Sequence, residues 1–216
     1  PIDIRSVMEY IPLPCTNKAQ GLPICQEKEE EEKTRGDEFN ARLLKTRTIV
    51  IADVINKKMA QRVISQLLLL EQENTEKDIK IFINSPGGDA DAGFAIYDMM
   101  KFVKPNVKVI CAGITASAAV IILLGALKEN RYSLPNARIL IHQPSTGIMG
   151  TAADIQIEAS EILKFRDKIN HLIAKETGQS VEKIENDTRR NFWMSGEEAM
   201  KYGLISKIIH NKKELE

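Results

Sequence analysis

Two adjacent glycines lie in a segment that could bind negative charge. They close the segment Asn84-Ser-Pro-Gly-Gly88, which follows an apolar run typical of a buried strand. Adjacent glycines let backbone N–H groups converge on one point, where they can bind a phosphate, a CoA thioester oxygen or a tetrahedral oxyanion. Taken alone, the pair is explained better by a plain tight turn, so this segment by itself does not define a site.

A serine and a histidine stand where catalytic groups are often found. Ser117 falls in the first turn of an expected apolar helix, where the helix dipole favours developing negative charge. His142 follows the apolar run Ile139–Ile141, and such folds expose catalytic groups at strand ends. A small packing residue and a hydrogen-bonded structural histidine are the respective alternatives. The other two histidines, His171 and His210, are expected on the surface.

The elements that must position these residues predict an α/β protein. Strand-like and helix-like runs alternate from about residue 36 onwards. The expected strands are residues 48–52, 78–84, 107–110, 131–134, 137–142 and 204–209, and the expected helices are residues 55–74, 92–103, 115–127, 152–177 and 195–203. The 19 uncharged residues 109–127 could span a membrane. We interpret them as a buried strand, a turn at Ala112-Gly113 and a buried helix.

The longest predicted helix covers residues 152–177. This stretch has no proline or glycine and carries apolar residues at helical spacing, so its length should be about 39 Å. A helix that long must project from a small globule and bury its apolar stripe on another subunit, which predicts an oligomer. We assign residues 36–216 to one domain, and residues 1–35, with the charged run Glu27–Lys33, to a mobile arm.

Composition excludes several classes of protein. The 30 basic and 30 acidic side chains cancel, so the chain is not a generally basic nucleic-acid binder. Its cysteines, Cys15, Cys25 and Cys111, have no CxxC spacing, which predicts a reducing compartment and no zinc site. The first twenty residues lack an unbroken apolar stretch. We therefore expect a cytoplasmic protein, with an organelle matrix or stroma of bacterial ancestry as the alternative.

In combination, these features resemble the proteolytic subunit of Clp protease, the ClpP family of serine peptidases. The resemblance covers roughly residues 36–210. The motifs that carry it include Ile83-Asn-Ser-Pro-Gly-Gly88, Ala92-Gly-Phe-Ala-Ile-Tyr-Asp98, Leu134-Pro-Asn-Ala-Arg138, Ile141-His-Gln-Pro144 and Glu197-Glu-Ala-Met-Lys-Tyr-Gly-Leu204. It implies the ClpP/crotonase-type spiral of ββα units, in which the 152–177 helix mediates oligomerisation.

The resemblance also implies a mechanism and partners. It assigns Ser117 as nucleophile, His142 as general base, and the N–H groups of Gly88 and Ala118 as the oxyanion hole. It further implies heptameric rings that stack through the 152–177 helix and cleave unfolded polypeptides in an internal chamber. An ATP-driven AAA+ unfoldase would dock on the ring and use the ATP, and this chain itself would need no cofactor or metal.

The third position of the triad departs from the family. Asn191 stands where an aspartate is usual. In a serine protease with a Ser-His-Asp triad, replacing that aspartate by asparagine lowers turnover about ten-thousand-fold, because the histidine is held in the wrong tautomer. This factor corresponds to about 5.4 kcal/mol. We therefore expect a slow peptidase when this chain is alone. Asp187, four residues earlier, is an alternative partner for the histidine.

Three further departures concern the pocket and the ring contacts. Ala118 stands where the family usually has methionine, and this replacement keeps the backbone N–H donor. The segment Ser145–Gly150 stands where the family has a glycine-rich strand. Arg189 replaces a residue that is often acidic and adjoins Arg190. Two adjacent cations favour an acidic partner. A second, non-identical ClpP-type subunit would supply one, so we hypothesise a mixed assembly.

Two other functions compete with this one. A non-catalytic scaffold subunit of a mixed ring would keep Ser117 and His142 only as relics. A crotonase-type CoA enzyme would share the spiral and a glycine-based oxyanion hole, but it would need a glutamate near Gly88 and an adenosine-binding segment, neither of which is apparent.

Overall fold

The computed structural model describes residues 38–215. The chain divides into two units, Pro1–Arg42 and Leu43–Glu216. The described residues of the first unit, 38–42, are helical, and the predicted mobile arm over residues 1–35 lies outside the described range. Every feature below belongs to the second unit.

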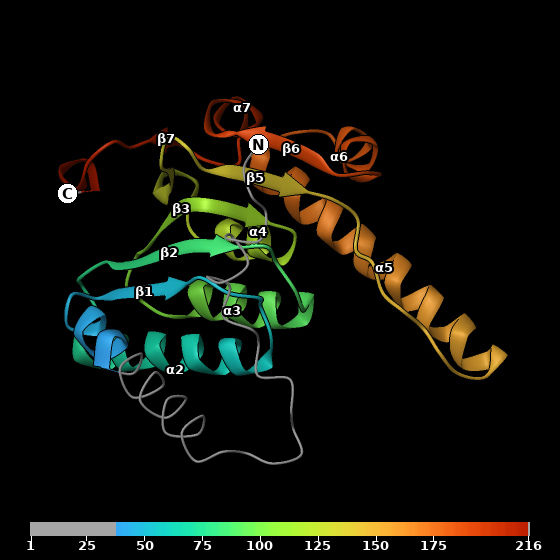
Figure 1. Cartoon of the computed structure of the whole chain (residues 1–216), viewed down its shortest axis with the longest axis horizontal. Coiled ribbons are helices and arrows are strands. Elements are labelled where there is room, and N and C mark those ends of the chain that lie inside the picture. Colours follow the sequence, from blue (N-terminus) through green and yellow to red (C-terminus); the bar gives the residue numbers. More distant parts are fainter. Residues whose placement is uncertain (1–37, 216) are drawn as a thin grey trace, which may run out of the picture. The chain divides into compact units, whose positions relative to one another are not determined.

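The second unit is organised around a seven-stranded sheet (Figure 1). Its strands are β1 (Thr48–Ile51), β2 (Ile79–Ser85), β3 (Val107–Ala116), β4 (Arg131–Ser133), β5 (Arg138–Ile141), β6 (Phe192–Ser195) and β7 (Lys207–Ile208). The order is β1-β2-β3-β4-β7, and β5 pairs with both β3 and β6. Every pairing is parallel except that of β5 with β6.

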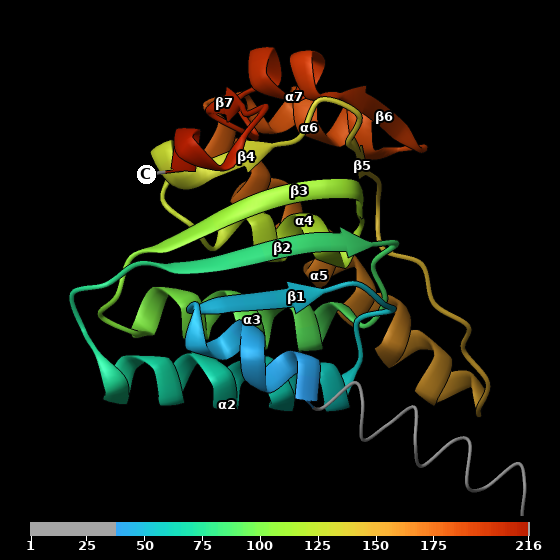
Figure 2. The same ribbon diagram turned by 60° about the vertical axis from the view of Figure 1, so that its left-hand side comes forward.

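Six α-helices accompany this sheet between residues 57 and 202. They are α2 (Lys57–Glu73), α3 (Ala90–Phe102), α4 (Ala118–Leu124), α5 (Ala152–Thr177), α6 (Val181–Thr188) and α7 (Gly196–Tyr202). Short 3-10 turns occur at Lys128–Asn130 and Lys212–Leu215. Figure 2 shows α2 and α3 beneath β1 and β2. Isoleucine, leucine and valine from the sheet and from these helices form the core.

The strand that precedes Ser117 is longer than the sequence predicts. We expected a turn at Ala112-Gly113 and a helix from residue 115, but β3 continues to Ala116. Its first part pairs with β4, and Ile114–Ala116 pairs with β5, so a second partner extends the strand. Gly113 has φ +92, and a Cβ there would lie 2.5 Å from Asn84 Oδ1, which explains why a glycine stands within the strand.

The apolar run after Ser117 is a buried helix. All seven residues of α4 are buried, because the helix packs against α3 and the sheet. Burial within the protein therefore accounts for this uncharged stretch. None of the helices between residues 38 and 215 is both long and apolar enough to cross a membrane.

Helix α5 projects away from the sheet (Figure 1). Its bounds, Ala152–Thr177, are those that the sequence predicts. A capping box between Thr151 and Asp154 begins the helix, and Gly178, in the left-handed conformation, ends it. Its first ten residues are exposed, whereas Ile169 and Ile173 near its other end are buried in the core.

Candidate active site

Ser117 occupies a strained position between β3 and α4. Its φ of 56° and ψ of −121° lie in a region that residues other than glycine rarely adopt, at a cost of about 1–3 kcal/mol. The backbone is held there because the Ser117 N–H donates to Leu140 O at 3.0 Å and its carbonyl accepts from Val120 N at 2.9 Å. The side chain makes no capping hydrogen bond, which leaves the hydroxyl free for chemistry.

The two glycines lie directly against this serine and against Ile55. A Cβ on Gly87 would lie 2.7 Å from Ser117 Cβ and 2.6 Å from Ala116 O, and a Cβ on Gly88 would lie 2.2 Å from Ile55 O. Both glycines also have positive φ, +98° and +144°. Only glycine lets the two backbones approach so closely. The pair thus does more than form a tight turn, because it brings a second backbone against Ser117.

The hydrogen bonds around Gly88 leave its own N–H free. Ile55 N donates to Gly87 O at 2.8 Å, and Asp89 N donates to Ile55 O at 2.9 Å. Ile55 and Gly88 thus form an isolated parallel β-bridge, in which the N–H and C=O of Gly88 point away from Ile55. Ala118 is the first residue of α4, so its N–H has no acceptor within the helix. Both donors line the same pocket as Ser117.

His142 and Asn191 lie at facing ends of paired strands. Ile141 pairs with Phe192 in the antiparallel β5–β6 ladder. His142 directly follows Ile141 and Asn191 directly precedes Phe192, so the two residues lie opposite each other at the same end of the ladder. Gln143 N donates to Thr188 O at 2.7 Å and keeps these segments together. On the other edge, β5 pairs with β3 through Leu140 and Ala116, which places His142 beside the strand that leads to Ser117.

Four of the five sequence-predicted site residues converge on one pocket, which Asn191 does not line, and their side chains are not hydrogen-bonded to one another. Gly88, Ser117, Ala118 and His142 line a pocket of about 600 Å³. Within residues 38–215, no hydrogen bond joins the His142 ring to Ser117 or to Asn191, which is exposed. Catalytic hydrogen bonds in unliganded enzymes are often long and tighten on substrate binding.

The alternative partner for the histidine is occupied elsewhere. The Asp187 carboxylate accepts a hydrogen bond from the Tyr202 hydroxyl at 2.6 Å and pairs with Lys183 Nζ at 2.6 Å. Burial, together with this hydrogen bond to a carboxylate, raises the pKa of Tyr202 above its usual value. Asp187 would have to break both contacts to reach His142. Asp187 is thus engaged away from His142 in this structure.

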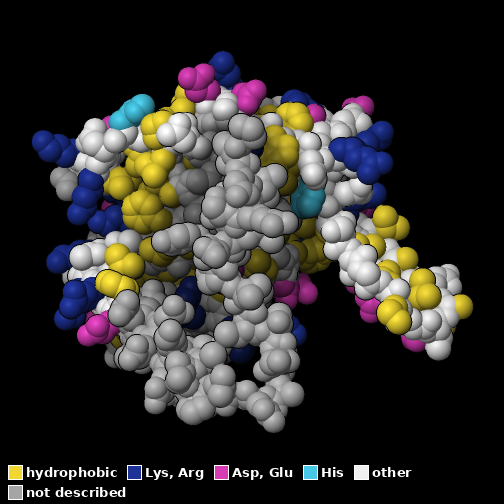
Figure 3. Space-filling model, viewed as in Figure 1, with side chains coloured by type: hydrophobic (Ala, Val, Ile, Leu, Met, Phe, Trp, Pro, Cys, Tyr) yellow, Lys and Arg dark blue, Asp and Glu magenta, His cyan; other side chains and the backbone are white. Residues whose placement is uncertain are grey.

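The sequence did not reveal the walls of this pocket. Ile162, Phe165, Ile169 and Ile173 of α5 line it together with Ile121 of α4. Figure 3 shows apolar side chains gathered in the angle between α5 and the rest of the unit. The apolar stripe of the helix was the available signal, but the sequence analysis predicts only subunit contacts for it, whereas its second half lines the pocket. In the described part of the chain, no three His, Cys, Asp or Glu side chains form a group that could hold a metal ion.

Comparisons with known proteins show which family the chain belongs to. The family model described as Clp protease matches residues 29–212. The ATP-dependent Clp protease proteolytic subunit 2 of Treponema denticola is 49% identical over 192 residues, which cover 88% of this chain and 96% of that protein. A solved structure of ClpP1 from Listeria monocytogenes, a variant in which an asparagine is replaced by aspartate, matches with a TM-score of 0.76 and 49% identity. That match covers 82% of this chain and 99% of the Listeria chain.

The chain therefore belongs to the Clp protease family as a proteolytic subunit, and its activity is that of a serine endopeptidase. The α/β fold class predicted from the sequence is confirmed by the same structural match. The family assignment also decides against the CoA-enzyme alternative.

Proposed function

We propose that Ser117 is the nucleophile of this peptidase and that His142 is its general base. Ser117 Oγ attacks the carbonyl carbon of the scissile peptide bond while His142 takes the hydroxyl proton. The resulting oxyanion accepts hydrogen bonds from the N–H groups of Gly88 and Ala118. The single observation that carries this proposal is the strained backbone of Ser117, pressed against the Gly87–Gly88 turn in a pocket that His142 also lines.

The remaining steps follow from proton balance. When the C–N bond breaks, His142 returns the proton to the leaving amine, and the acyl group stays on Ser117 as an ester. A water molecule then attacks this ester, with His142 again accepting the proton. The tetrahedral intermediate collapses, the carboxylic acid leaves, and Ser117 recovers its hydroxyl hydrogen from His142. No cofactor takes part in any of these steps.

We infer that Asn191 makes this machinery slow. An amide can accept a hydrogen bond from the imidazole N–H, but it carries no charge with which to stabilise the imidazolium that forms when Ser117 attacks. The contacts of Asp187 with Tyr202 and Lys183 support the assignment, because they engage the alternative carboxylate elsewhere. The solved Listeria relative is itself a variant in which asparagine was exchanged for aspartate.

We propose that the chain works in rings and that a second ClpP-type subunit completes the assembly. Membership of the Clp protease family implies oligomeric rings and a partner unfoldase that supplies unfolded polypeptides. Arg189 and Arg190 are both exposed and have no ion-pair partner between residues 38 and 215. An acidic surface on a non-identical ring would supply that partner. Both relatives carry numbered names, subunit 2 and ClpP1. We expect the assembly to reside in the cytoplasm.

A scaffold role is the second candidate, and Asn191 is the observation that favours it. Such a subunit would shape the ring and leave proteolysis to its partner. The two functions differ in whether Ser117 contributes to turnover.

Hydrolysis of a short fluorogenic peptide tests both candidates. The purified chain is compared with Asn191→Asp and Ser117→Ala, and the oligomer mass is recorded in the same samples. We expect a weak rate that depends on Ser117 and that rises by orders of magnitude in Asn191→Asp. Complete rings that are equally inert in all three forms would instead establish the scaffold role.

A further inference from the structure

One buried hydroxyl group holds the glycine turn that faces Ser117. Ser85 is the last residue of β2, and its side chain is fully buried. Its Oγ donates a hydrogen bond to Asp53 O at 2.6 Å and accepts one from Gly87 N at 3.1 Å. Gly87 is buried as well, so its N–H needs an acceptor within the protein. Ser85 does not line the pocket itself, so it can affect the chemistry only through the turn.

The strand end that carries this hydroxyl is fixed relative to the nucleophile. Ser85 pairs with Thr115 of β3, two residues before Ser117. The register shifts just before this pair, and there the Asn84 side chain accepts a hydrogen bond from Ile114 N at 3.0 Å. Irregular pairing of this kind often re-aims a strand next to an active site. The Ser85 hydroxyl therefore connects the strand that leads to Ser117 with the flexible turn.

The direction of the Gly88 N–H depends on the carbonyl of Gly87. The two groups belong to one trans peptide unit, so they point in opposite directions. Ile55 N donates to Gly87 O at 2.8 Å, which turns the Gly88 N–H away from Ile55. Ser85 acts on both partners of this bond, because it binds the Gly87 N–H and also the carbonyl of Asp53, two residues before Ile55.

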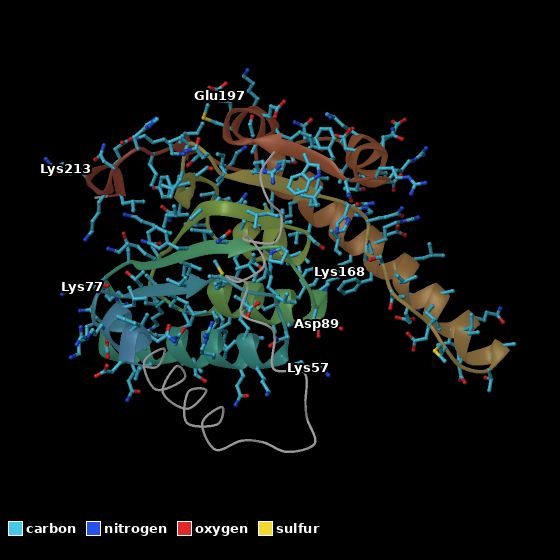
Figure 4. All side chains as sticks on the ribbon, in the orientation of Figure 1. Lys57, Lys77, Asp89, Lys168, Glu197 and Lys213 are labelled. Carbon is cyan, nitrogen blue, oxygen red and sulfur yellow. The ribbon has the colours of Figure 1, made fainter. Side chains whose placement is uncertain are left out.

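The other end of the turn is anchored separately. Asp89 follows the turn and begins α3, where its Oδ1 accepts from Ala92 N at 3.1 Å (Figure 4). The Asp89 N–H donates to Ile55 O at 2.9 Å. These contacts hold the end that leads into α3, whereas the Ser85 hydroxyl holds the end that leaves β2. Glycine adopts many backbone conformations, so Gly87 and Gly88 need an anchor on each side to keep one of them.

We propose that Ser85 is a positioning residue for hydrolysis, because its hydroxyl holds the Gly88 N–H in the direction that the oxyanion requires. The oxyanion forms only after Ser117 attacks, so a misdirected donor raises the barrier without weakening substrate binding. The inference rests on the proposed function, since it concerns the oxyanion donor of that site. A serine that served stability alone would leave turnover unchanged when it is replaced.

Ser85→Ala removes the hydroxyl, and Ser133→Ala is its matched control. Ser133 is also fully buried at the end of a strand of the same sheet, and its hydroxyl donates to Leu134 O at 3.0 Å. Like Ser85, it does not line the pocket. Both variants lose a buried hydrogen bond, so both should unfold at a lower temperature than the native chain. Only Ser85→Ala should change catalysis.

Peptide hydrolysis separates the positioning role from a role in stability. We measure kcat and KM for the native chain and both variants at equal oligomer mass. In Ser85→Ala we expect kcat to fall about ten- to a hundredfold, less than for complete loss of a donor, while KM stays within about twofold. Ser133→Ala should keep both native values. A kcat in Ser85→Ala within about twofold of that in Ser133→Ala would overturn the inference.

Binding of a peptide aldehyde gives a second readout, at equilibrium. Ser117 Oγ adds reversibly to the aldehyde carbon, its proton passes to His142, and the new oxyanion accepts a hydrogen bond from the Gly88 N–H. The corresponding peptide alcohol binds without this bond. In Ser85→Ala the aldehyde should bind more weakly by the same factor as kcat falls, and the alcohol should bind as before. Equal weakening of both ligands would indicate damage to the whole pocket and would overturn the inference.

Ser85→Cys replaces Ser85→Ala if the alanine variant does not form rings. A thiol has nearly the shape of the hydroxyl group but is a weaker donor and acceptor. We therefore expect a lower kcat with an unchanged KM in this variant too. A native kcat in Ser85→Cys would overturn the inference.

The same measurements distinguish failure of this inference from failure of the proposed function. Turnover that depends on Ser117 and is insensitive to Ser85 would refute the positioning role and leave the peptidase assignment intact. If neither the native chain nor Asn191→Asp showed turnover that depends on Ser117, the proposed function would be refuted, and the inference with it.

Discussion

The two halves of the site are built in different ways. The nucleophile half, residues 85–88 and 117–124, lies between a long strand and a buried helix and is fixed by close backbone contacts. The base half, residues 142–150 and 188–191, lies mostly outside regular structure and is largely exposed. The hydrogen bonds of Gln143 to the carbonyls of Thr188 and Arg189 hold the base half together. A single chain therefore fixes its nucleophile more firmly than its base.

This difference fits a subunit whose activity depends on assembly. The exposed first part of α5 and the segment 143–150 belong to the base half or adjoin it. Burial of these surfaces on other subunits would order the base half, which is largely exposed in a single chain. The following variants test this contrast, beginning with those that should have the largest effect.

Gly87→Ala should disrupt the nucleophile half of the site and sharply slow the covalent labelling of Ser117. The new Cβ would lie within 2.7 Å of both Ala116 O and Ser117 Cβ, so the turn would have to move away from the serine. Displacing an oxyanion donor costs about a hundredfold or more in rate. Covalent labelling of Ser117 by a fluorophosphonate measures this loss. Gly147→Ala is the control, because no atom lies within 4 Å of its added Cβ, and its labelling should not change.

Glu176→Gln should destabilise the contacts that hold the end of α4, the helix of the nucleophile half. Arg131 is fully buried, pairs with Glu176, and donates to Leu124 O at 3.2 Å and to Ala126 O at 2.9 Å at the end of α4. Removing the carboxylate leaves a buried cation without its counter-charge, at a cost of about 3–5 kcal/mol. Thermal unfolding should show a lower Tm. An unchanged Tm would mean that this pair does not anchor α4.

Tyr202→Phe should weaken the base half by a smaller amount. It removes a hydrogen bond to the Asp187 carboxylate in the helix that leads to Asn191, a loss of about 1.5–3 kcal/mol. The pKa of Tyr202 is raised by burial, so the folded state favours the neutral phenol. This contribution is complete below pH about 10, the usual pKa of tyrosine, and is lost as the pH rises beyond it.

Denaturant unfolding at two pH values measures this contribution. At neutral pH the native chain should be the more stable of the two, and above pH about 10 the difference from Tyr202→Phe should shrink. A difference that stays constant across this range would contradict the account of the phenol.

Asp154→Asn should have the smallest effect, at the exposed beginning of α5. Hydrogen bonds from the Thr151 hydroxyl and backbone lower the pKa of Asp154, so the charged carboxylate supports the cap. Its contribution is present at neutral pH and is lost as the pH falls through the lowered pKa. Hydrogen exchange of the first turn should quicken in the variant, while amides near Ile173 keep their protection. If the variant changed the exchange rates of the first turn and of the amides near Ile173 equally, the cap would not be what holds the first turn.

The sequence predicted the nucleophile half better than the base half. Helical spacing predicted α5 to the residue, and the glycine pair and Ser117 stood out because their backbone requirements are local. The continuation of β3 to Ala116 was missed, since it depends on pairing with β5, a strand that comes later in the chain. The engagement of Asp187 by Tyr202 was also invisible, because fifteen residues separate them and only folding brings them together.

The rate at which a fluorophosphonate labels Ser117 tests the central claim most directly. The native chain, Asn191→Asp and Asn191→Ala are compared at equal oligomer mass, with Ser117→Ala as the blank. If the uncharged amide limits the histidine, the aspartate variant should react up to about ten-thousand-fold faster than the native chain. The alanine variant should then stay within about tenfold of the native chain. Labelling of the native chain as fast as that of Asn191→Asp would contradict the account.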